Sequence, residues 1–168
     1  SGSNPSSHQY SGSYAGAAPE AEIVMVDMGT DDPTINLLYP GDMYSQYLPA
    51  GYNNGAKIMS GSWAYFANNG VYDVPAYKLD KFTYENKDLS VPQSAGNLGP
   101  GTVKSPSTAK NSISVGANQK NNINTLWPPS STGPTDDGRV KPDIVAPGMN
   151  TISTKSSMPN VIACSVQT

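Results

Sequence analysis

The stretch Ser94-Ala95-Gly96-Asn97-Leu98-Gly99-Pro100 decides how this chain is interpreted. A short run of apolar and small residues precedes it, so we expect a strand over 89–95 that ends just before Asn97. Such a strand holds the Asn97 side-chain amide at its carboxyl end. A fixed amide donor can meet a developing negative charge without reorganising, and Gly96 allows backbone and ligand to approach closely.

Other short apolar runs occur on both sides of this stretch. We expect strands over 22–28, 57–62 and 112–117, and the first of these should be buried on both faces. A proline-initiated helix, interrupted near residue 40, is expected over 31–47, a tight Asp-Gly reversal over 135–139, and an extended segment over 142–148. Strands that alternate with connecting segments predict an α/β fold with a largely parallel sheet flanked by helices.

Composition excludes several classes of protein. At 168 residues a single domain is expected, and 36% hydrophobic content is compatible with a buried core. Only 14% of residues are charged and the net charge is -3, which disfavours nucleic acid as a partner. No run of about 18 apolar residues is present, so no membrane span is expected in this segment. The abundance of Ser, Asn, Tyr and Gly over Lys and Glu favours an extracellular or lumenal protein.

Four segments, taken in order, carry a family resemblance. Residues 16–26 read Gly-Ala-Ala-Pro-Glu-Ala-Glu-Ile-Val-Met-Val and residues 57–64 read Lys-Ile-Met-Ser-Gly-Ser-Trp-Ala. The stretch at 94–117 follows, and then come Ser-Ser-Thr-Gly-Pro at 130–134 and Lys-Pro-Asp-Ile-Val-Ala-Pro-Gly at 141–148. Together these blocks resemble the interior of the catalytic domain of subtilisin-like serine peptidases (subtilases).

The resemblance implies a subtilisin-like α/β fold, in this chain an incomplete one, with a helix over 71–87. The family's His-Gly-Thr-His and Gly-Thr-Ser-Met-Ala motifs are not in this sequence. We therefore expect residues 1–168 to be part of a single peptidase catalytic domain, without the segments that carry the catalytic Asp, His and Ser. The chain as given is expected to be inactive, because it holds neither nucleophile nor base.

The resemblance also implies roles for individual residues toward a protein or peptide substrate. The amide of Asn97 corresponds to the oxyanion-hole donor. One wall of the pocket for the side chain before the scissile bond would come from Ser62, Trp63 and Ala64. The opposite wall would come from Ser94, Ala95 and Gly96. No cofactor is required, and a structural calcium ion at the Asp136-Asp137-Gly138 turn is possible, although a solvated turn is favoured.

Several alternatives stay open from the residues alone. Asn97 could cap a turn, and Trp63 could be a core aromatic residue. His8 is best read as an exposed loop residue, and Cys164 as a small buried thiol. Pro92 and Gln93 stand where the family has apolar residues, Gly61 where it often has Asn, and Ala64 where it has Gly. These departures favour the alternative that the protein is a non-catalytic pseudoenzyme or an extracellular structural or binding protein; an unrelated carbohydrate-binding β module is a weaker reading.

Overall fold

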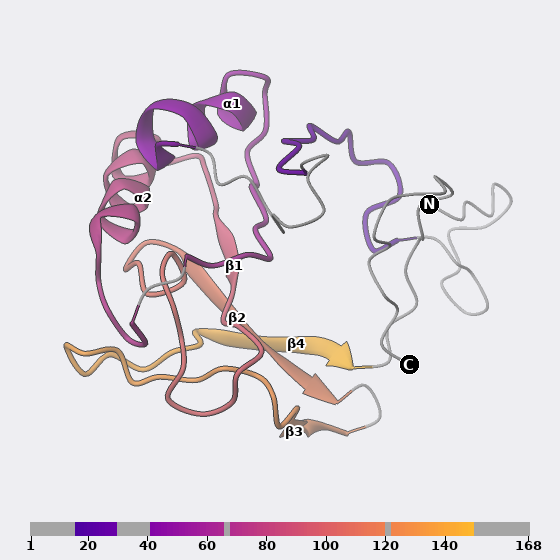
Figure 1. The fold of residues 1–168 in the computed structure, drawn as a ribbon. Coiled ribbons are helices and arrows are strands. Elements are labelled where there is room, and N and C mark those ends of the chain that lie inside the picture. The colour runs from indigo at the N-terminus through magenta and orange to yellow at the C-terminus, as the bar shows by residue number, and fades with distance from the viewer. Residues whose placement is uncertain (1–15, 30–40, 66–67, 120–121, 150–168) are drawn as a thin grey trace, which may run out of the picture.

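The computed structural model describes residues 16–29, 41–65, 68–119 and 122–149. Its helical elements are the π-helical turn η1 (Met43–Tyr47), α1 (Leu48–Tyr52) and α2 (Val74–Glu85). Its strands are β1 (Pro92–Ser94), β2 (Ile113–Gln119), β3 (Asn122–Leu126) and β4 (Ile144–Met149). Figure 1 shows α1 and α2 together on one side of the sheet.

The sheet is mixed and is built around β2. Strands β1 and β4 both run parallel to β2 and flank it on opposite edges, since Val115 pairs with Ser94 and with Ile144. Strand β3 pairs antiparallel with the end of β2. The expected parallel arrangement is thus found in two of these three pairings. The third is antiparallel because only two residues separate β2 from β3, too few for a parallel crossover.

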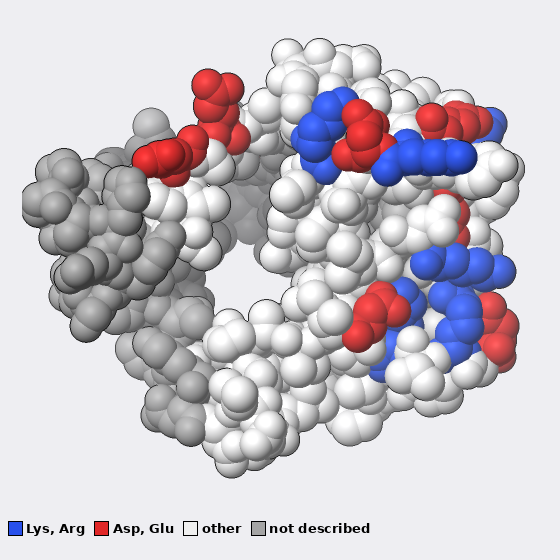
Figure 2. Space-filling view, turned by 180° about the vertical axis from the view of Figure 1, so that it is seen from behind, with Lys and Arg blue, Asp and Glu red and all other residues white. Residues whose placement is uncertain are grey.

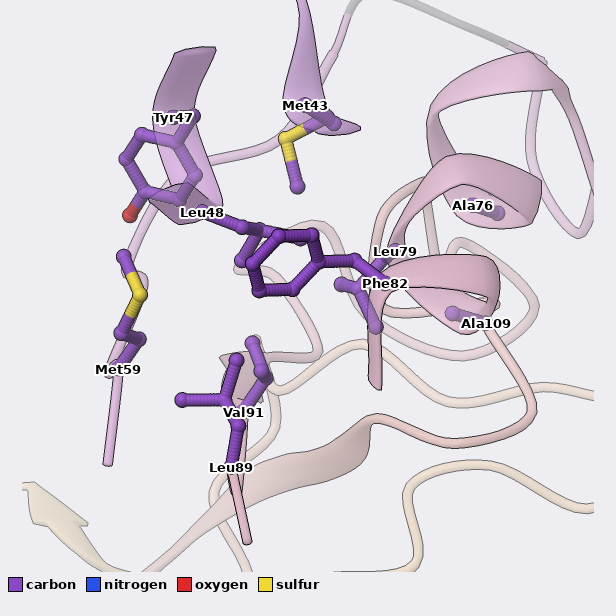
Figure 3. Close-up of a cluster of buried hydrophobic side chains, with 10 residues drawn as sticks. All are labelled: Met43, Tyr47, Leu48, Met59, Ala76, Leu79, Phe82, Leu89, Val91 and Ala109. Carbon is purple, nitrogen blue, oxygen red and sulfur yellow. The ribbon is translucent and has the colours of Figure 1, made fainter. Parts of the chain in front are cut away.

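Helix α2, expected over 71–87, packs on the sheet through one apolar face. It begins after Asp73, whose carboxylate accepts a hydrogen bond from the Ala76 amide at 3.1 Å. Figure 3 shows Leu79 and Phe82 of this helix facing Val91, the residue just before β1. The buried cluster also includes Met43, Tyr47, Leu48, Met59, Ala76, Leu89 and Ala109. This core fixes the strand that leads to Asn97.

Asp80 joins α2 to the turn before β2. Its side chain is only 8% exposed and accepts hydrogen bonds from the backbone amides of Lys110 (2.9 Å) and Asn111 (2.6 Å). The Tyr72 hydroxyl donates a third bond at 2.7 Å. A buried carboxylate is tolerated when donors surround it, so Asp80 ties the helix layer to the sheet layer.

The segment expected as a strand over 57–62 runs parallel to the 90–94 segment. The amides of Met59 and Gly61 donate to Ser90 and Pro92, and the Ser94 amide donates back to Gly61. Pro92 has no N–H, so the bond that a regular ladder would direct from residue 92 to the Met59 carbonyl is missing. Pairing is therefore reduced to two isolated bridges, while the other edge of β1 still pairs with β2.

The prediction of a buried strand over 22–28 is wrong. Ile23 is 82% exposed and Met25 81%, and none of the described strands pairs with this segment. An apolar run forms a buried strand only if a neighbouring strand accepts its backbone hydrogen bonds. Of the helix expected over 31–47, residues 31–40 lie outside the described part, and helical structure over 43–52 continues past the expected end.

Charges on the surface are mixed rather than segregated by sign. Figure 2 shows Lys and Arg next to Asp and Glu, mostly on the side that carries α2. Ion pairs join Lys57 to Asp88 and Arg139 to Asp137. This distribution gives no single-sign patch, among the described residues, of the kind that attracts a polyanion. No helix in the same part of the chain has the length and apolar character to cross a membrane.

Candidate functional site

The Asn97 loop, residues 96–102, leaves the carboxyl end of β1 through a glycine that no other residue could replace without strain. Gly96 has φ +114°, and a Cβ built on it would lie 2.7 Å from Ser131 Oγ. Asn97 follows with its side chain exposed. None of the hydrogen bonds found among the described residues involves its amide, so that donor faces solvent.

Buried hydroxyl groups hold the Asn97 loop in place. Ser131 is fully buried, and its Oγ accepts hydrogen bonds from the Leu98 amide (3.2 Å) and from Thr102 Oγ1 (2.7 Å). The Ser131 amide in turn donates to the Gly96 carbonyl at 2.9 Å, and the Gly99 amide donates to Pro129. The Ser-Ser-Thr-Gly-Pro block therefore positions the loop, a role that sequence reasoning missed.

Neither serine of this block is accessible as a nucleophile. Ser130 is 1% exposed, and its hydroxyl oxygen accepts a 2.9 Å hydrogen bond from the Ala117 amide of β2. Ser131 is engaged as described above. Both hydroxyls are buried and accept hydrogen bonds from backbone amides, so they act as structural groups.

Two pockets meet at Gly96 and Asn97. The larger, which we call the sheet pocket, has a volume of about 360 Å³ and is lined by Ser60, Gly61, Ser62, Pro92, Gln93, Ser94, Gly96, Asn97, Val115, Gly116, Ala117, Ala146, Pro147 and Gly148. The smaller, which we call the loop pocket, has a volume of about 180 Å³ and is lined by Ala64, Tyr65, Ala95, Gly96, Asn97, Leu98, Thr102, Lys104 and Ser131. The exposed Asn97 amide therefore stands between two concave surfaces.

The two segments expected to form opposite walls contribute to both pockets. Ser62 and Ser94 line the sheet pocket, whereas Ala64 and Ala95 line the loop pocket. Trp63 lines neither pocket. Its ring packs edge-on against Tyr47 and Tyr65, with centroids 5.4 and 5.2 Å away, and its Nε1 donates to the Tyr47 hydroxyl at 3.3 Å. Trp63 thus packs at the margin of the aromatic core, the alternative that the sequence left open.

Gly61 and Gln93 are adjacent in space. A Cβ on Gly61 would lie 2.4 Å from Gln93 Nε2 and 2.7 Å from Oε1. Gln93 is 1% exposed, and neither polar atom of its amide has a hydrogen-bond partner. The Gln93 side chain therefore occupies the space that a side chain at position 61 would need. The two departures from the family pattern, Gly61 and Gln93, therefore belong to a single packing arrangement.

The Asp-Gly turn forms as expected, with Gly138 at φ +81° and its amide donating to Thr135. The Arg139 guanidinium and the Thr135 hydroxyl lower the pKa of Asp137 to about 2. Among the described residues no three His, Cys, Asp or Glu side chains gather as a metal site. His8 and Cys164 lie outside the described ranges.

Comparison with known proteins gives several relatives. The chain is 27% identical over 226 residues to the serine protease/ABC transporter B family protein tagD of Dictyostelium discoideum, covering 88% of this chain and 12% of that protein. It is 46% identical over 69 residues to the serine protease AprX of Bacillus subtilis strain 168, covering 37% and 16%.

Among solved structures, the prenylagaramide maturation protease PagA matches with a TM-score of 0.49 and 22% identity, covering 66% of this chain and 37% of PagA. An S218A mutant of the PatA protease domain matches with 0.48 and 22%, covering 61% and 35%. The chain thus spans only a small part of the curated relatives that it matches. The model of the subtilase family matches residues 2–167, nearly the whole sequence. This chain therefore belongs to the subtilase family.

Proposed function

We propose that the protein containing this chain is a serine endopeptidase that hydrolyses peptide bonds through an Asp/His/Ser triad supplied by segments outside these 168 residues. In this proposal the chain supplies the oxyanion donor and the surfaces that receive the substrate. Attack of a serine on a peptide carbonyl places negative charge on the carbonyl oxygen, and a preorganised donor stabilises that charge.

One observation carries the proposal, namely the setting of Asn97. Its side chain is exposed at the carboxyl end of β1, at the junction of the two pockets, on a loop fixed by buried hydroxyls. The side chain of a turn-capping asparagine would form hydrogen bonds with nearby backbone groups. None of the hydrogen bonds found for the described residues involves the Asn97 side-chain amide. A side-chain amide that is held in place and makes no internal hydrogen bond is available to donate one to a transition state.

The departures that favour a pseudoenzyme are accommodated without loss of this setting. Pro92 removes one hydrogen bond on the side of the 57–62 segment, and β1 keeps its pairing with β2. Gln93 fills the space left by Gly61. Strand β1 therefore still delivers Asn97 to its end, which favours the enzyme over the scaffold.

The test uses the full-length protein and its Asn97→Ala variant on a peptide substrate. We expect kcat to fall by about 10²–10³-fold, a magnitude taken over from subtilisin, with KM nearly unchanged because the donor acts on the transition state. Asn124→Ala, an exposed asparagine outside both pockets, is the matched control and should leave kcat unchanged. Labelling by a fluorophosphonate, which reports an activated serine, should occur in all three proteins. Absence of labelling in the wild-type protein would sink the proposal.

A further inference from the structure

We propose that Lys104 makes the loop pocket selective for an acidic side chain, so that the enzyme cuts after Glu or Asp. This inference rests on the proposed function, because it assigns a preference to the same site. It begins from the charge of the pocket. Of the described residues that line the loop pocket, Lys104 alone carries a charged side chain.

The backbone places Lys104 on the pocket wall. Val103 and Ser105, on either side of it, are fully buried, whereas Lys104 is partly exposed. With both neighbours buried, Lys104 is the residue of this stretch that lines the loop pocket. The segment is held on two sides, because the Val103 amide donates to Thr132 and the Tyr65 amide donates to Ser105.

The other lining residues in the described part of the chain offer an incoming carboxylate no competing charge. Ala64, Ala95 and Leu98 contribute apolar surface. The Thr102 hydroxyl is already engaged, because its Oγ1 lies within hydrogen-bond reach of both Ser131 Oγ and the Gly99 carbonyl. In a concave, partly apolar site of this kind an ammonium group interacts with a carboxylate more strongly than it would in open water.

Position and size indicate which part of the substrate enters. The carbonyl carbon under attack is bonded to the Cα that carries the preceding side chain, so a carbonyl oxygen at Asn97 places that side chain beside Asn97. The loop pocket shares Gly96 and Asn97 with the sheet pocket and has a volume of about 180 Å³. This is smaller than the roughly 300–1,000 Å³ of pockets that hold drug-sized ligands, and it suits one side chain.

The experiment measures kcat/KM of the full-length protein on peptides that differ only at the residue before the scissile bond, with Glu, Gln, Leu or Lys there. Glu and Gln have nearly the same shape, so their ratio isolates the charge. We expect Glu to be favoured over Gln by about 10- to 150-fold, the usual range for a hydrogen bond to a charged group. Lys104→Met should bring the ratio close to one, and Lys104→Glu should favour Lys.

Lys87→Met is the matched control, since Lys87 is exposed beyond the end of α2 and lines neither pocket, and it should keep the wild-type ratio. Fluorophosphonate labelling of every variant separates the two ideas. A labelled enzyme without preference for Glu, or one whose preference survives Lys104→Met, overturns the role of Lys104 and leaves the peptidase standing. An enzyme that neither labels nor cleaves overturns the proposed function and this inference with it.

Discussion

The contact between Gly61 and Gln93 predicts that one substitution changes the sign of its effect with its background. In the wild-type protein Gly61→Ala places a methyl group 2.4–2.8 Å from the Gln93 amide atoms, inside van der Waals contact. Gln93 is 1% exposed, so its amide can avoid this methyl group only by leaving its packed position and turning toward the sheet pocket, which Gln93 also lines. Overpacking of this kind destabilises by about 1–3 kcal/mol.

In a Gln93→Ala background the same methyl group enters the space that the amide has left. Gly61 does not need a positive φ, so alanine fits its backbone and stabilises by about 0.4–1 kcal/mol through the unfolded state. The effect of Gly61→Ala should therefore differ between the two backgrounds by at least about 1.4 kcal/mol, which double-mutant analysis resolves.

The assay is urea unfolding of the full-length protein and its three variants, followed by circular dichroism. Gly138→Ala is a useful contrast, because Gly138 has φ +81° and no atom lies within 4 Å of the position that a Cβ would take there. Gly138→Ala should lower the free energy of unfolding through backbone strain, by the same amount in the wild-type and the Gln93→Ala backgrounds. Equal destabilisation by Gly61→Ala with and without Gln93 would refute the reasoning.

Three further results are expected. Asp80→Ala removes a buried acceptor of hydrogen bonds from the Lys110 and Asn111 amides and should lower the free energy of unfolding by about 1–3 kcal/mol, measured by urea unfolding. Ser131→Ala removes the acceptor of the Leu98 amide, so hydrogen exchange at that amide should accelerate while exchange in α2 is unchanged. Hydrogen bonds from Lys78 to Asp42, and from Arg139 to Asp137, lower the pKa of both carboxyls. The stability that these two carboxylates contribute is therefore present above about pH 4 and should fade as the pH falls toward about 2. In an acid titration, Asp137→Asn should lose less stability over that range than the wild-type protein.

The sequence predicted those parts of the fold that depend on neighbouring residues. The strand before Asn97 and the Asp-Gly turn are encoded by short patterns and occur where expected, whereas helix α2 was expected from the family resemblance. The strand over 22–28 failed because an apolar run does not reveal whether another strand lies beside it. Its exposed side chains show that pairing, rather than hydrophobicity, decides strand formation.

Contacts between distant positions could not be read from the sequence. Gly61 and Gln93 stood out as two separate departures, and only their juxtaposition explains both. The sequence did not reveal the role of Ser131, because the hydrogen bonds that fix the Asn97 loop join Ser131 to Leu98 and Thr102, which are distant in sequence. Lys104 carried no recognisable motif, and its place on the pocket wall follows from the burial of its two neighbours.

The bond between the Leu98 amide and Ser131 spans 33 positions of the chain, and this has a consequence for biosynthesis. A ribosome adds about 5–20 residues per second, so residue 131 is made about two to seven seconds after residue 98. During that interval the Asn97 loop of the nascent chain lacks the hydrogen bonds that Ser131 will provide. The fixed position of the Asn97 loop would therefore be reached late in translation, after most of this segment has been made.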